Sequence, residues 1–114
     1  MDIINIIFAL ASIGFGAFGW LAPRYTMRTL DISGGKTTMG MSEVRASAGA
    51  LFVGMGVGAL LLTTPTAYVM LGFCWTGAAI GRLTSLAMDG VSPKKLTFFA
   101  IEAAVGIPAI ILNL

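Results

Sequence analysis

Four long apolar stretches run along the chain, separated by short polar or turn-forming segments. They cover residues 3–22, 42–62, 66–88 and 96–114. A bilayer core of about 30 Å is crossed by about 20 predominantly apolar residues in a helix, so each stretch predicts a membrane-spanning helix. The pattern therefore predicts an all-α integral membrane protein. We expect a single domain over residues 1–114, an antiparallel four-helix bundle with short connections.

The first stretch is expected to be a retained helix and not a cleaved signal peptide. Asp2 stands where a signal peptide carries positive charge. The apolar run of residues 3–22 also exceeds the usual core of a signal peptide, which has about 7–15 residues.

The basic residues that lie outside the predicted spans are confined to two of the connections, residues 23–41 and 89–95. The five of them are Arg24, Arg28, Lys36, Lys94 and Lys95. By the positive-inside rule both connections face the cytoplasm, so both termini face the outside, the periplasm of a bacterial inner (plasma) membrane. Connection 23–41 is predicted to lie at the interface, with residues 24–30 as a short amphipathic turn attracted to anionic lipid. The alternative is that this connection is a docking surface for a partner.

Composition supports a membrane protein and excludes other classes. Apolar residues make up 57% of the chain and charged residues 11%, against about 25% charged in soluble domains. A disordered chain, a nucleic-acid-binding protein and a disulfide scaffold are excluded. With one cysteine and no histidine, no His-based metal or haem site can form. We expect no catalytic residues, no cofactor and no enzyme activity.

Glycines are spaced for close helix contact in the second and third spans. Gly54 and Gly58 form one GxxxG pair, and Gly77 and Gly81 form another. Small residues let helix backbones approach closely in a membrane, where apolar side chains alone provide little driving force. These pairs predict tight packing, either within one chain or between chains.

A few ionisable residues interrupt the apolar spans. Arg82 lies seven residues before Asp89 and Glu102 seven after Lys95, so both lie about 10 Å from the cytoplasmic ends of consecutive antiparallel helices. The sequence predicts an Arg82–Glu102 ion pair. A charge inside a span is costly and usually has a partner.

A wider polar cluster is predicted at the same level of the membrane. Its members are Glu43, Arg45, Arg82, Asp89 and Glu102. One interpretation is that these groups fix the register of the helices. The other is a pocket for an anionic head group, a proton or a small solute. Because the charges nearly balance and lie near the membrane edge, the structural interpretation is preferred.

The order of these residues resembles a family of small bacterial four-helix membrane proteins known as a domain of unknown function. The resemblance rests on an acid-x-Arg-Ala run from Glu43, Gly81-Arg82 and Asp89-Gly90 around the end of the third span, and Glu102 in the fourth. It extends from Pro23 into the fourth span. The resemblance implies that the five charged residues form the family's polar signature, and it implies no activity.

The expected function is that of a non-catalytic accessory or assembly subunit. Its host would be a larger inner-membrane complex, such as a respiratory or photosynthetic one, and its partners would be lipids and larger membrane subunits or further copies of itself. Two alternatives use Arg45, Arg82 and Glu102 as a site. One is an oligomeric carrier or channel for a small solute, and the other a lipid- or quinone-binding module.

Overall fold

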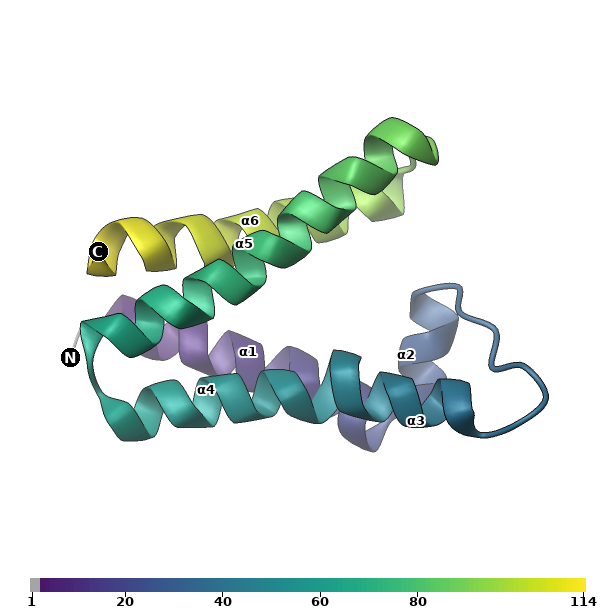
Figure 1. The fold of residues 1–114 in the computed structure, drawn as a ribbon, viewed down its shortest axis with the longest axis horizontal. Coiled ribbons are helices and arrows are strands. Elements are labelled where there is room, and N and C mark those ends of the chain that lie inside the picture. The colour runs from purple at the N-terminus through teal and green to yellow at the C-terminus, as the bar shows by residue number, and fades with distance from the viewer. Residues whose placement is uncertain (1–2) are drawn as a thin grey trace. The chain divides into compact units, whose positions relative to one another are not determined.

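The chain is helical throughout. The computed structural model describes residues 3–114, and over that range it contains helices and short connections without any strand (Figure 1). The predicted all-α class is therefore confirmed. Asp2, whose charge supports a retained first helix, lies outside the described residues.

The helices divide into two compact units, one ending at Leu61 and the other covering Leu62–Leu114. The N-terminal unit contains α1 (Ile3–Leu21), α2 (Pro23–Thr29), α3 (Met39–Arg45), the π-helical turn η1 (Ala46–Ala50) and α4 (Leu51–Leu62). The C-terminal unit is a hairpin of α5 (Pro65–Met88) and α6 (Pro93–Asn113). That the two units form one domain stays a prediction.

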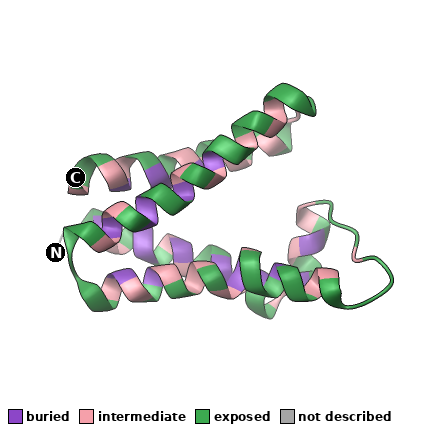
Figure 2. Ribbon diagram, in the orientation of Figure 1, coloured by how far each residue is buried: buried purple, intermediate pink, exposed green. Residues whose placement is uncertain are grey.

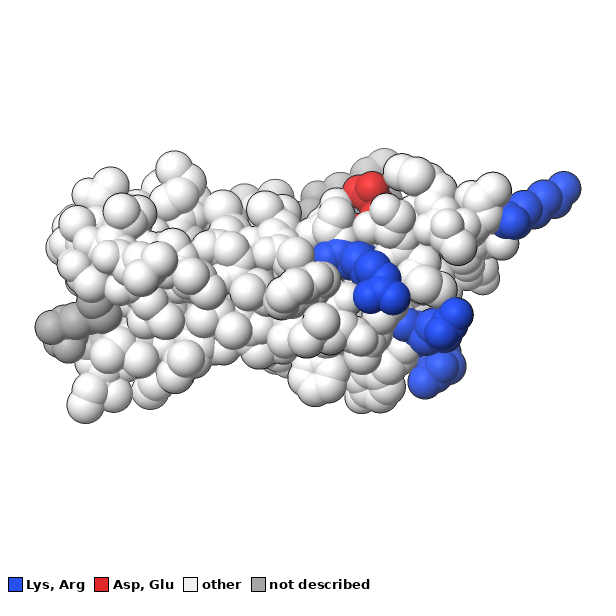
Figure 3. All heavy atoms as spheres, turned by 90° about the horizontal axis from the view of Figure 1, so that it is seen from below, with Lys and Arg blue, Asp and Glu red and all other residues white. Residues whose placement is uncertain are grey.

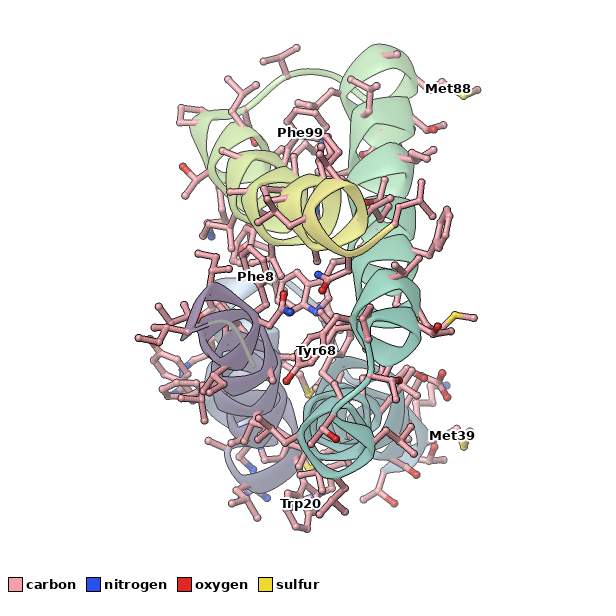
Figure 4. The ribbon with its side chains drawn as sticks, turned by 90° about the vertical axis from the view of Figure 1, so that its left-hand side faces the viewer. Phe8, Trp20, Met39, Tyr68, Met88 and Phe99 are labelled. Atoms are coloured by element: carbon pink, nitrogen blue, oxygen red, sulfur yellow. The ribbon has the colours of Figure 1, made fainter. Side chains whose placement is uncertain are left out.

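Four helices are long and apolar enough to cross a membrane, as the hydrophobic pattern predicted. They are Ile3–Leu21, Met39–Leu62, Pro65–Met88 and Pro93–Asn113. The second of these joins α3, η1 and α4 into one continuous helix. Large apolar side chains cover their outer surfaces, and Met39 and Met88, which extend away from their helices in Figure 4, are 65% and 79% exposed. The chain is a small multi-pass membrane protein.

Two caps determine where α5 and α6 begin. The side chains of Thr64 and Ser92 accept hydrogen bonds from the backbone N–H groups of Ala67 and Lys95, each at 3.3 Å. A proline follows each cap, at a position where its missing N–H costs nothing. The cap at Ser92 starts α6 three residues before the predicted start of the fourth span, so residues 93–95 belong to the helix and not to the connection.

Glycines bring α1 and the second long helix into backbone contact. A Cβ added to Gly16 would lie 2.6 Å from the carbonyl oxygen of Gly49, and one added to Gly19 would overlap the carbonyl oxygen of Ala48. The π turn η1 contains both Ala48 and Gly49. Figure 2 shows how buried positions recur along each long helix while exposed positions cover the rest. The π turn is thus the part of its helix that α1 approaches most closely.

A hydrogen bond joins the same two helices one turn away. The Ser12 hydroxyl, which is fully buried, donates to the Phe52 carbonyl at 2.8 Å. Ser12→Ala is expected to lower the free energy of unfolding by about 0.6–1 kcal/mol, the usual size of an interhelical hydrogen bond in a membrane protein. The measurement is equilibrium unfolding in mixed detergent micelles with increasing dodecyl sulfate.

Ser47→Ala is the matched control for this prediction. The Ser47 hydroxyl bonds Glu43 of its own helix and joins no second helix. It should therefore change the stability less than Ser12→Ala does. Equal effects of the two substitutions would contradict an interhelical role for Ser12.

The C-terminal hairpin is also closed by glycines. A Cβ on Gly72 would meet the Gly106 carbonyl oxygen at 2.8 Å and the Ile110 nitrogen at 2.9 Å. A Cβ on Gly106 would meet the Thr76 nitrogen at 2.5 Å. The backbones of α5 and α6 therefore touch at these two positions, which carry a single glycine each and no GxxxG spacing.

The four glycines of the predicted GxxxG pairs lie elsewhere. A Cβ added to Gly54, Gly58, Gly77 or Gly81 would meet nothing within 4 Å. Neither pair forms the helix contact within its own unit. A different face of α4 meets α1, and a different face of α5 meets α6. For these pairs, packing between chains stays a prediction.

Candidate functional site: the intramembrane charges

The predicted ion pair in the C-terminal hairpin is present. The Arg82 guanidinium of α5 donates from Nε to Glu102 Oε1 at 3.0 Å and from an Nη to Glu102 Oε2 at 3.2 Å. Both carboxylate oxygens of Glu102, on α6, are therefore engaged by one planar guanidinium. Bidentate pairs of this kind are among the strongest and most directional hydrogen-bonded contacts in proteins.

The two side chains of this ion pair are buried to different extents, and an aromatic ring lies beside one of them. The Glu102 side chain is 11% exposed and that of Arg82 is 32% exposed. The Arg82 guanidinium carbon also lies 5.4 Å from the ring centroid of Phe98, within the range of a cation–π contact. Phe98 precedes Glu102 by four residues, so both lie on one face of α6. Arg82 is thus held by a carboxylate and an aromatic ring from the same helix.

Arg45 has a different partner from the one the polar-cluster hypothesis implies. Its Nη1 donates to the backbone carbonyl of Trp20 at 2.8 Å. Trp20 is in the last turn of α1, where carbonyls lack a partner within the helix and the helix dipole favours positive charge. Arg45 therefore caps the end of α1 from the neighbouring helix.

The remaining members of the predicted cluster have local contacts. Glu43 accepts a hydrogen bond from the Ser47 hydroxyl at 2.6 Å. Asp89 is the C-cap of α5, and its backbone N–H bonds the Ser85 carbonyl at 2.8 Å. Glu43 and Arg45 belong to the N-terminal unit, whereas Arg82, Asp89 and Glu102 belong to the C-terminal unit. The structure brings Arg82 and Glu102 together; one cluster of all five stays a prediction.

Three features were not predicted from the sequence. They are the contact of Phe98 with Arg82, the bond of Arg45 to the Trp20 carbonyl, and the π turn Ala46–Ala50. Only the spacing of Phe98 and Glu102 carried a signal, since residues four apart share a helix face. A backbone carbonyl such as that of Trp20 leaves no mark in a sequence, and nothing in the run Ala46–Ala50 marks a π turn. Among residues 3–114, no group of three or more metal-binding side chains lies together.

Comparison with known proteins identifies a family over almost the whole chain. The family model described as "Domain of unknown function (DUF4345)" matches residues 1–113. No curated protein and no solved structure matches the chain.

Proposed function

Since this chain belongs to the DUF4345 family, whose description assigns no activity, we propose from its geometry that it is a non-catalytic accessory or assembly subunit of a larger membrane complex. Its expected location is a bacterial inner membrane with the two basic connections in the cytoplasm. Its expected partner is a membrane-spanning helix of a larger subunit.

The bonding of the intramembrane charges supports a structural role. Glu102 presents both of its oxygens to Arg82, and Arg45 donates to a helix end. A carrier needs charged groups that exchange partners with a solute, whereas these groups hold pairs of helices together. This observation favours the structural interpretation of the charges over a solute site.

The observation that carries the proposal is the division of the glycines into two sets. In the first set, a neighbouring helix of the same unit occupies the space that a Cβ would need. These glycines are Gly16, Gly19, Gly49, Gly56, Gly72 and Gly106. The GxxxG pairs Gly54/Gly58 and Gly77/Gly81 have open space beside them. Small-xxx-small faces let the backbones of two membrane helices approach closely, so these two faces suit helices of a partner.

Purification of the tagged protein from its native membranes tests this proposal. In a mild detergent we expect a complex of fixed stoichiometry with larger subunits, identified by mass spectrometry. The double variants Gly54→Leu/Gly58→Leu and Gly77→Leu/Gly81→Leu should each reduce the bound partner by about tenfold or more, because leucines keep the backbones apart, and a loss of about 1.4 kcal/mol corresponds to a factor of ten.

Gly14→Leu is the matched control for these variants. Gly14 also has nothing within 4 Å of an added Cβ, but it is not part of a GxxxG pair. This variant should retain the complex. Recovery of the wild type only as a free monomer or homo-oligomer would refute the proposal, as would equal loss of partner in the control.

A further inference from the structure

A basic surface lies at the end of the N-terminal unit where α1 meets α2. Arg24 and Arg28 are exposed on α2, one helical turn apart, while Pro23 and Met27 on the adjacent face of the helix are buried. Helix α2 contacts both α1 and α3. Arg45 ends α3 and reaches the end of α1 through its bond to Trp20. Arginines from two helices therefore converge on one helix end.

This surface carries an excess of positive charge. Over residues 3–61, four basic side chains (Arg24, Arg28, Lys36, Arg45) stand against two acidic ones (Asp31, Glu43). Like charges four residues apart on a helix repel each other. In the face drawn in Figure 3 the Lys and Arg atoms lie in one half, where fewer acidic atoms are visible, and the other half shows no charged side chain.

Aromatic side chains surround the same helix end. The Tyr25 ring lies 5.8 Å from that of Phe18, centroid to centroid, and both are more than 40% exposed. Trp20, which projects from α1 in Figure 4, is 43% exposed. Exposed Trp and Tyr at the end of a membrane helix mark the level of the lipid head groups. The arginines are therefore placed where lipid phosphates lie.

We propose that Arg24, Arg28 and Arg45 bind the phosphate of an anionic phospholipid, with the aromatic side chains at the level of its glycerol backbone. Guanidinium groups match phosphate oxygens in geometry and charge. A lipid fits better than an acidic segment of a protein, because the arginines are bordered by exposed aromatic rings and an apolar span. The proposal concerns a surface apart from the GxxxG faces and is independent of the subunit role.

Native mass spectrometry of delipidated protein in detergent tests this proposal. With equimolar phosphatidylglycerol and phosphatidylcholine, we expect the wild type to retain phosphatidylglycerol selectively. Arg24→Gln/Arg28→Gln should weaken phosphatidylglycerol binding about 25-fold, at about fivefold for each basic residue near the surface. The Arg45 guanidinium has five N–H donors and gives one of them to the Trp20 carbonyl, so the others can bind phosphate while the helix end stays capped. Arg45→Gln alone should therefore weaken phosphatidylglycerol binding about fivefold by the same reasoning. Both arginines of α2 are exposed, so unchanged circular dichroism is expected for the double variant.

Lys94→Gln/Lys95→Gln is the charge-matched control, because it removes two positive charges from the C-terminal unit. It should leave phosphatidylglycerol binding within about twofold of the wild-type value. Equal weakening in this control, or no lipid preference in the wild type, would overturn the proposal. So would complete displacement of the lipid by excess inorganic phosphate, which would indicate a free-phosphate site. Binding of a larger subunit that depends on Arg24 and Arg28, without any lipid preference, would indicate an acidic protein partner instead.

Discussion

Glu102→Ala is expected to lower the free energy of unfolding by about 2–3 kcal/mol, the cost of leaving a charge unpartnered inside an apolar span. The substitution removes both acceptors of the Arg82 guanidinium. An arginine stays charged under all ordinary conditions, so it must either remain unpaired or turn toward the head groups. Unfolding in mixed micelles with increasing dodecyl sulfate, followed by circular dichroism, measures the effect.

A double variant distinguishes the loss of the ion pair from the cost of leaving one charge buried without its partner. Arg82→Leu/Glu102→Leu removes both charges together, and replacement of a buried pair by apolar residues is often close to neutral. We therefore expect the free energy of unfolding of the double variant to lie within about 1 kcal/mol of the wild-type value. If it is as unstable as Glu102→Ala, the two residues act independently and the ion pair does not hold the hairpin together.

Gly106→Ala is expected to destabilise the α5–α6 hairpin by about 3 kcal/mol, at the upper end of the usual cost of overpacking. The added methyl group would meet the Thr76 backbone nitrogen at 2.5 Å and the Gly72 carbonyl oxygen at 3.0 Å. These backbone atoms can move only if the two helices separate. The same unfolding titration measures the loss of stability, and cross-linking between cysteines placed in α5 and α6 would report the separation.

Gly77→Ala and Gly81→Ala are matched controls in the adjoining helix. Nothing lies within 4 Å of either added methyl group. Because alanine is favoured over glycine in a helix by about 1 kcal/mol or less, both should be neutral or slightly stabilising in the isolated protein. A loss of stability at Gly77 or Gly81 equal to that at Gly106 would show that the hairpin packs through the GxxxG face after all.

The number and type of the elements could be predicted from the sequence because a bilayer restricts what can cross it. Only helices of about 20 apolar residues satisfy all of their backbone groups in lipid. The Arg82–Glu102 pair could be predicted for the same reason, since an arginine within a span needs a partner and the only acid at its depth on the next helix is Glu102. The start of the fourth span was predicted less accurately, because Ser92 caps α6 and starts it three residues before the apolar stretch begins.

The tertiary structure alone decided which helix faces meet. Spacing selected Gly54/Gly58 and Gly77/Gly81, yet the contacts use Gly19, Gly49, Gly72 and Gly106. A glycine permits close approach, but the matching surface of a second helix determines whether approach occurs. In the same way, Arg45 needed a hydrogen-bond acceptor, and the chain brought it a backbone carbonyl at the end of α1 in place of a carboxylate. The composition of each span therefore determined that it lies in the membrane, whereas its neighbours there were determined by the shapes of the helix surfaces.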